Sequence, residues 1–182
     1  MLTKNDIEKY FMAEKQESLL FLIVGLVAIV LAALFLFVYK SHFFKGAATA
    51  LIVIGLLQVV VGYAVYNRSD ADRMRMVYAY DMNPFELKTV EIPRMQKVNS
   101  NFIVYKWIEV VLLAAGLLVV LYNQFSANGL TKNSNTNALI YGLAVALTVQ
   151  SSIVLTAVFF AEKRAITYTK QLEDFVFTNK IT

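Results

Sequence analysis

One carboxylate is the strongest candidate for chemistry in this sequence, because it lies inside an apolar segment. Glu109 belongs to the stretch Phe102 to Tyr122, FIVYKWIEVVLLAAGLLVVLY, which is otherwise long and apolar enough to cross a bilayer. A charge near the centre of a membrane helix costs about 2.5–3.5 kcal/mol on insertion scales, so it is usually turned inward, paired or protonated. Ionisable groups in this setting often mark proton or cation pathways.

Two glutamines in other apolar segments are expected to lie near Glu109. At about 1.5 Å per helical residue, Gln58 falls about 12 Å and Glu109 about 10 Å from the same membrane boundary, with Gln150 somewhat deeper. We therefore predict an intramembrane polar cluster of Glu109, Gln58 and Gln150. We favour a structural hydrogen-bond cluster that fixes helix register; the alternative is a proton or cation site.

A second group consists of charged residues of both signs, predicted to lie near the cytoplasmic membrane boundary. Such an arrangement usually forms interhelical ion pairs, which is the interpretation we favour. The alternative is a site for anionic lipid headgroups, attracted by the basic excess of the adjoining loop. The members of this interfacial charge ring are Glu14, Glu17, Arg68, Asp70, Arg73, Arg94, Lys106, Glu162 and Arg164.

Residues that several classes of membrane enzyme require are missing from the sequence. It contains no cysteine, which excludes thiol redox chemistry and thiolate metal sites, and its single histidine, His42, excludes haem ligation by paired histidines. The sequence also lacks the His-Glu-x-x-His and Gly-x-Ser-x-Gly motifs. We therefore predict a protein that is not an enzyme and has no catalytic, cofactor-binding or metal-binding residues.

The elements that must position these residues are long apolar helices. Of the 182 residues, 58% are hydrophobic, and four uncharged runs are each long enough to cross a hydrocarbon core of about 30 Å. The predicted fold class is all-α: a polytopic membrane protein with a four-transmembrane-helix bundle and helical cytoplasmic extensions. The runs are 18–39, 46–67, 110–131 and 133–161, and the third is shifted to begin near Phe102 because residues 126–129 read as a loop.

The distribution of Lys and Arg predicts the orientation of the chain. Of the 17 basic residues, 14 lie before the first run, between the second and third, or after the fourth, and only Lys40, Lys45 and Lys132 lie on the opposite side. Because basic residues concentrate in cytoplasmic loops, we expect a multi-pass protein of the cell inner membrane with both termini cytoplasmic.

The cytoplasmic parts are predicted to be helical rather than disordered. We expect a cytoplasmic amphipathic N-terminal helix at 1–17, transmembrane helices 1 and 2 at 18–66, a cytoplasmic helical hairpin at 67–101, transmembrane helices 3 and 4 at 102–161, and a cytoplasmic C-terminal helix at 162–182. In the hairpin, Asn83 and Pro84 have the types of an N-cap and a first helical residue, and Pro93 can begin the next helix.

These features favour a protein that works by association in the bilayer. We expect self-association, or a place as subunit of a membrane complex, through the cytoplasmic helices; the alternative is an oligomeric channel or proton-coupled transporter centred on Glu109. A membrane enzyme acting on lipids or hydrophobic substrates is a third class, for which no residues can be named. Expected partners are the lipid bilayer, copies of the same chain or another subunit, and anionic lipid, but not nucleic acid. In size and span count the chain is similar to small bacterial membrane proteins such as the immunity proteins of pore-forming bacteriocins.

Overall fold

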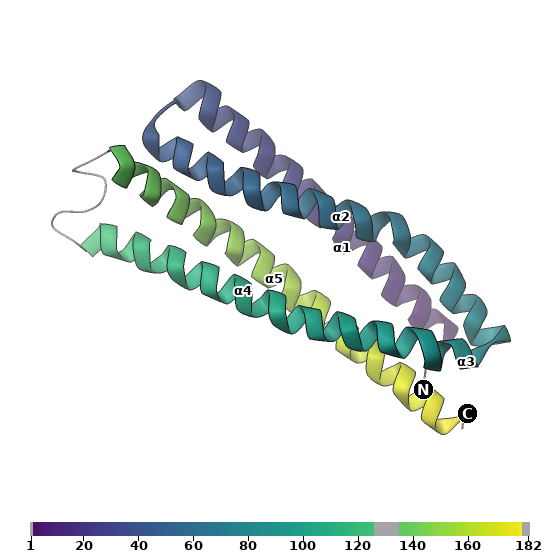
Figure 1. Cartoon of the computed structure of the whole chain (residues 1–182). Helices are drawn as coiled ribbons and strands as arrows, with labels where there is room; N and C mark the ends of the chain where they lie inside the picture. The colour runs from purple at the N-terminus through teal and green to yellow at the C-terminus, as the bar shows by residue number, and fades with distance from the viewer. Residues whose placement is uncertain (1, 126–134, 180–182) are drawn as a thin grey trace. The chain divides into compact units, whose positions relative to one another are not determined.

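The computed structural model describes residues 2–125 and 135–179, and 96% of them are helical. The elements are α1 (Lys4–Leu34), the π-helical turn η1 (Phe35–Tyr39), α2 (His42–Met82), α3 (Pro84–Glu86), the π-helical turn η2 (Leu87–Glu91), α4 (Ile92–Phe125) and α5 (Asn135–Thr178) (Figure 1). Four helical stretches are long and apolar enough to cross a membrane, which confirms the all-helical prediction with four such helices. The predicted loop at 126–129, Lys132 and Lys180 lie outside the described residues.

The first helix begins at the capping motif that its sequence contains. The Thr3 hydroxyl and backbone N–H both donate to the Asp6 carboxylate, at 2.6 and 2.9 Å, and the Asp6 N–H donates back to the Thr3 hydroxyl at 3.3 Å. This reciprocal arrangement satisfies backbone donors that an isolated helix start leaves unpaired. The same hydrogen bonds lower the pKa of the Asp6 carboxyl below its usual value.

The connection between α1 and α2 is a tight turn centred on Lys40. This residue has a φ of 50°, in the left-handed region, and its N–H donates to the carbonyl of Phe35 at 3.3 Å. The next helix starts two residues later, with the Ser41 hydroxyl accepting from the Phe44 N–H at 3.4 Å. A turn this short makes α1 and α2 neighbouring antiparallel helices (Figure 1).

The junction between α2 and α4 follows the predicted prolines, with two differences. Pro84 begins α3 as expected, but the Asn83 side chain makes no capping hydrogen bond, and the first turn is closed by the Glu86 N–H on the Asn83 carbonyl at 2.9 Å. The expected separate helix at Pro93 is instead joined to α3 through the π-helical turn Leu87–Glu91. Proline lacks an N–H and its ring clashes with the carbonyl four residues earlier, so a wider turn before Pro93 relieves that conflict.

Contacts divide the chain into two compact units, each containing parts of all four long helices. Unit 1 consists of Met1–Leu20, Gly62–Lys106 and Ala157–Thr182, and unit 2 of Phe21–Val61 and Trp107–Thr156. Each unit has its own core, and the two cores differ in the size of the side chains that fill them.

Small residues fill the core of unit 2 and let helix backbones touch. A Cβ atom added at Gly25 of α1 would lie 2.7 Å from the carbonyl oxygen of Gly55 of α2. A Cβ atom at Gly46 of α2 would lie 1.9 Å from the Leu139 oxygen of α5, and one at Gly142 of α5 would lie 1.9 Å from the Phe43 oxygen of α2. The buried residues around these contacts are Ala28, Ala32, Ala47, Ala48, Ala50, Leu51 and Ala146.

Large side chains fill the core of unit 1. Tyr10 of α1 stacks on Tyr168 of α5 with ring centroids 4.1 Å apart, and Phe11 meets the Tyr168 ring edge-on at 6.1 Å. The buried members of this core are Leu2, Ile7, Tyr10, Phe11, Met76, Ala79, Leu87, Met95, Ala165, Tyr168, Leu172 and Phe175. The N-terminal part of α1 therefore packs its apolar face against the C-terminal part of α5.

We predict that Gly142→Ala destabilises the fold by about 1–3 kcal/mol, because the new methyl group has no room beside the Phe43 carbonyl and must push α2 and α5 apart. Thermal unfolding of the purified protein followed by circular dichroism measures the effect. Ala33→Val, which enlarges an exposed side chain of α1, is the matched control and should leave the transition unchanged. An equal shift in both variants would contradict the role given to the backbone contact.

Candidate functional site

The polar cluster predicted from the sequence forms in part within unit 2. The Gln150 side-chain amide of α5 donates to the Gln58 amide oxygen of α2 at 2.7 Å, and both residues are buried. Glu109 of α4 is half-buried, and its carboxylate faces the hydroxyl of Ser151, the residue after Gln150. No hydrogen bond between Glu109 and either glutamine occurs among the described residues. The structure therefore brings the two glutamines together and places Glu109 beside Ser151.

Three polar atoms of this cluster are buried without a hydrogen-bond partner among the described residues. They are the amide nitrogen of Gln58, the Oε2 atom of Glu109 and the hydroxyl oxygen of Ser151. A buried polar group without a partner costs about 1–3 kcal/mol, so these atoms retain a capacity to donate to or accept from a further polar group. In the described ranges, no three metal-ligating side chains of the His, Cys, Asp or Glu type gather here or elsewhere.

The members of the interfacial charge ring lie in unit 1 and form ion pairs, some with one another and some with charged residues outside the predicted set. Lys106 of α4 donates to both carboxylate oxygens of Glu162 of α5, at 2.6 and 2.8 Å, and Arg164 of α5 makes a bidentate contact with Glu17 of α1. The other pairs are Arg68 with Glu14 at 3.8 Å, Arg73 with Asp70 at 3.5 Å, Lys15 with Asp70, and Arg94 with Glu91 at 2.7 Å. Several of these pairs join different helices, so the charges tie α1, α2, α4 and α5 together within the unit.

The Arg94–Glu91 pair is the most buried of these contacts. Glu91 is 1% exposed, and Arg94 donates to both of its carboxylate oxygens, at 2.7 and 2.8 Å. The Arg94 guanidinium also lies over the Phe11 ring, 5.3 Å from its centroid. Burial alone would lower the pKa of Arg94, but the hydrogen bonds and charge of Glu91 outweigh it, so the pKa of the guanidinium is raised.

Aromatic hydroxyl groups surround this buried pair. Burial, followed by the charge of Glu91, raises the pKa of Tyr168, and burial, followed by the charge of Glu14, raises that of Tyr10. Both tyrosines therefore remain neutral over the physiological range. Glu91 was missed in the sequence, although an acid three residues before Arg94 and between Val90 and Ile92 is the spacing at which helical side chains pair.

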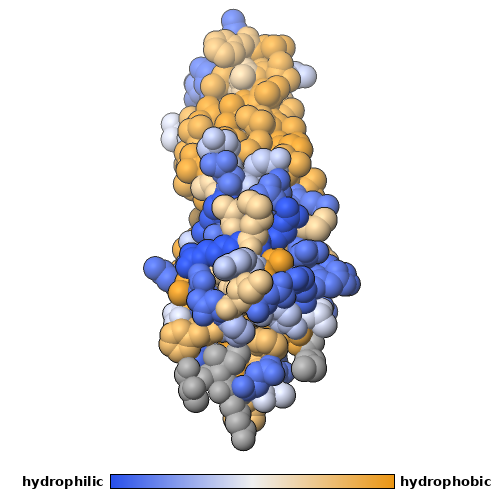
Figure 2. Space-filling model, turned by 90° about the vertical axis from the view of Figure 1, so that its right-hand side faces the viewer, coloured by the Kyte–Doolittle hydropathy of each residue, from blue (hydrophilic) through white to orange (hydrophobic). Residues whose placement is uncertain are grey.

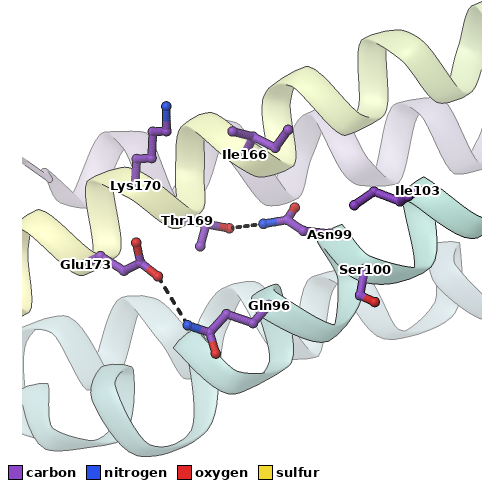
Figure 3. A pocket seen from close by; sticks show the side chains of 8 residues that line it. All are labelled: Gln96, Asn99, Ser100, Ile103, Ile166, Thr169, Lys170 and Glu173. Atoms are coloured by element: carbon purple, nitrogen blue, oxygen red, sulfur yellow. Dashed lines mark hydrogen bonds between the residues drawn. The ribbon is translucent and has the colours of Figure 1, made fainter.

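A groove of about 410 Å³ lies in unit 1 between matching faces of α4 and α5 (Figure 3). On each helix its lining residues recur at spacings of three, four and seven, so one face of each helix contributes. Two hydrogen bonds cross it, from the Asn99 amide to the Thr169 hydroxyl at 2.9 Å and from the Gln96 amide to the Glu173 carboxylate at 3.2 Å. The lining residues are Gln96, Asn99, Ser100, Ile103, Ile166, Thr169, Lys170 and Glu173.

Comparison of the chain with protein-family models, with curated proteins and with solved structures finds no match. The function is therefore argued from the geometry of the two units alone.

We predict that Arg94→Met destabilises unit 1 by about 3–5 kcal/mol, because it leaves the Glu91 carboxylate buried without a counter-charge. The double variant Glu91→Leu/Arg94→Met should recover most of that loss, since an apolar pair leaves no buried charge. Arg75→Met, which breaks the more exposed pair with Glu86, is the control and should cost under about 1 kcal/mol. Chemical denaturation of the four proteins measures these differences, and a double variant no more stable than Arg94→Met would argue against buried charge as the cause.

The pH dependence of stability should report the burial of Glu14. Its side chain is 13% exposed, and burial raises the pKa of its carboxyl above the usual 4.5, although Arg94, Arg68 and the Ser69 hydroxyl act in the opposite direction. A raised folded-state pKa means that ionisation weakens the fold: the stabilisation is complete below about pH 4.5 and is lost as the pH rises through the folded pKa.

We therefore predict that Glu14→Gln, which cannot ionise, gains in melting temperature relative to the parent protein as the pH is raised from 4 to 8. Melting curves of both proteins across that range provide the measurement. Glu8→Gln, an exposed substitution in the same helix, should follow the parent protein at every pH. Parallel curves for Glu14→Gln and the parent would show that the Arg68 and Arg94 charges fully offset burial.

Proposed function

We propose that the chain is a non-enzymatic integral membrane protein of the cell inner membrane, which works by self-association or as a subunit of a membrane complex. Its contacts outside the bilayer are made by the helical hairpin between the second and third spans. The observation that carries this proposal is an exposed apolar stripe on that hairpin, in a part of α2 and α3 that lies beyond the apolar spans.

Insertion into a membrane is supported by the surface of the four apolar stretches. In the most apolar 18 residues of each stretch, only 6% to 33% are buried. Large apolar side chains such as Leu57, Val60 and Leu118 are more than 60% exposed. The hydrocarbon of a bilayer is the solvent in which such a surface is stable. The excess of Lys and Arg on one side supports cytoplasmic termini.

The apolar stripe of the hairpin consists of Met74, Tyr78, Met82 and Phe85. The first three recur every four residues along α2, and the four side chains are 64%, 64%, 71% and 49% exposed. Residues between them, Met76 and Ala79, face the core of unit 1. Hydrophobic residues also appear between hydrophilic ones on the side of the molecule that faces the viewer in Figure 2.

The side-chain types of this stripe favour a protein partner. Methionine is flexible and polarisable, and tyrosine combines a large apolar ring with a polar tip, so both suit adaptable protein surfaces. Exposed apolar patches outside a lipid-facing region often mark sites of protein–protein interaction. Three other apolar residues of the hairpin do not belong to this stripe: Met95 is buried in the unit 1 core, and Val77 and Val98 pack against it.

The alternative is an oligomeric channel or proton-coupled transporter centred on Glu109. The buried, unpartnered atoms of Glu109, Ser151 and Gln58 favour it, because they can offer polar partners inside an apolar stretch. Two features weigh against it: Gln150 already donates to the Gln58 amide oxygen, and Glu109 makes no hydrogen bond to either glutamine in the described part of the chain. The cluster as a whole fits a register-fixing role better than a continuous pathway.

We predict that a photoreactive residue placed separately at Tyr78 or Phe85 forms protein adducts in intact cells, because both side chains project from the hairpin. Denaturing gels measure the product: an adduct at twice the 20.5 kDa of the chain identifies self-association, and any other mass identifies a different subunit. The same residue at Met76, which is 3% exposed on the same helix, is the control and should form none.

Two outcomes would contradict the proposal. Adducts from Val60 or Leu118 but not from Tyr78 or Phe85 would place association within the apolar stretches and leave the hairpin as a structural brace. Proton or cation flux into proteoliposomes that Glu109→Gln abolishes, with thermal stability unchanged, would favour the channel.

A further inference from the structure

The apolar stripe of the hairpin continues along the same face of α2 toward the second span. At about 100° per residue, Ala71 and Met74 lie within about 40° of Tyr78 around the helix axis, and all three are exposed. Asn67, also exposed, precedes them, and the spacings from Asn67 to Tyr78 are four, three and four residues. Such spacings are those of a coiled-coil seam, so this face can receive another helix along its length.

Opposite charges border the two sides of this face. Arg68 and Arg75 lie about 60–80° from Tyr78 on one side of it. Asp70 and Asp81 lie about 60–80° from Tyr78 on the other side. The four charged side chains are 41% to 54% exposed. Each makes an ion pair within the chain, but a guanidinium has five N–H donors and a carboxylate about four acceptor sites, so each can take a second partner.

A face with one basic and one acidic side is complementary to its own copy only when the two helices run parallel. In a parallel pair, the basic side of each helix meets the acidic side of the other, and Asp70 and Arg75 have the five-residue offset of charges that pair across such a seam. In an antiparallel pair, like sides would meet. Two copies that cross one bilayer in the same direction have parallel α2 helices, because α2 is a single helix that runs from a span into the hairpin.

We infer that the partner bound by this face is a second copy of the chain, in a parallel two-fold pair of α2 helices with two Asp70–Arg75 ion pairs between the copies. The inference rests on the association through the hairpin proposed above and names the partner. The stripe is small beside the area of about 800 Å² per partner in a standard interface. Two copies held in one bilayer in the same orientation, however, lose less rotational freedom on pairing than two soluble proteins do.

Disulfide crosslinking tests the partner and the orientation together, because the chain has no cysteine of its own. A parallel two-fold pair brings identical residues opposite one another. In isolated membranes treated with a mild oxidant, Ala71→Cys and Met74→Cys should therefore each give a disulfide-linked product of twice the 20.5 kDa of the chain. Met76→Cys, 3% exposed on the same helix, and Lys97→Cys, exposed on α4, are the controls and should give none.

Charge reversal tests the ion pairs between the copies. In the Met74→Cys background, Asp70→Arg and Arg75→Asp should each reduce the crosslinked product about fivefold or more, because each turns two attractive contacts into two repulsive ones. Co-expression of the two variants should restore the product, since every contact between unlike chains again joins opposite charges. Loss of the Lys15–Asp70 or Arg75–Glu86 pair within a chain cannot be restored in this way. Lys97→Glu, an exposed reversal outside the face, should change nothing.

The results separate this inference from the proposed function. A photoreactive residue at Tyr78 that gives an adduct of another mass, with no disulfide product, identifies a different subunit; it overturns the inference and leaves the hairpin as the association surface. A disulfide between co-expressed Met74→Cys and Met82→Cys chains, with none from Met74→Cys alone, shows antiparallel pairing and overturns the inference. Charge reversals that co-expression does not rescue also overturn it. The absence of both adducts and disulfides overturns the inference and the proposed function together.

Discussion

The apolar surface that this chain leaves exposed is the constraint on which the rest of its structure depends. Four helices of more than thirty residues each expose leucine, valine, isoleucine and aromatic side chains over most of their apolar stretches. Few large side chains are buried in unit 2, so the arrangement of its helices is specified by the fit of their surfaces. Glycines and alanines let the helix backbones come into contact, and each contact fixes the position of one helix against another. Dispersion between closely fitted surfaces then replaces the hydrophobic driving force that a soluble core uses.

Unit 1 is held together by a different set of contacts, namely ion pairs and a core of large side chains. Several of its charged side chains are paired between helices, and its apolar core is made mainly of large aromatic and aliphatic groups. The buried Arg94–Glu91 pair and the Tyr10–Tyr168 stack lie in contact with the same Phe11 ring, so packing and electrostatics depend on one another at this point. A charge pair in such a place contributes more to a unique arrangement than to stability, because its desolvation offsets much of its attraction.

The sequence predicted the features that follow from local pattern. Apolar run length predicted the four long helices, and Pro84 predicted the start of α3. Contacts that depend on how each helix is rotated about its own axis were harder to predict from the sequence. Glu109 was expected with Gln58 and Gln150, yet its carboxylate faces Ser151 and makes no hydrogen bond to either glutamine among the described residues. Glu91 was missed although its spacing to Arg94 is that of a helical ion pair, because that spacing does not show whether the pair is buried.

The π-helical turn before α4 has a consequence at the level of the gene. A π-helical turn holds one more residue than an α-helical turn. The turn Leu87–Glu91 therefore corresponds to an insertion of one codon into a sequence that would otherwise form a continuous α-helix. Removing that residue would restore α-helical pairing but would rotate everything before it by about 100° relative to α4. Leu87, which is buried in the unit 1 core, would be turned away from it. The one extra residue of this turn therefore sets which side chains before it face the core.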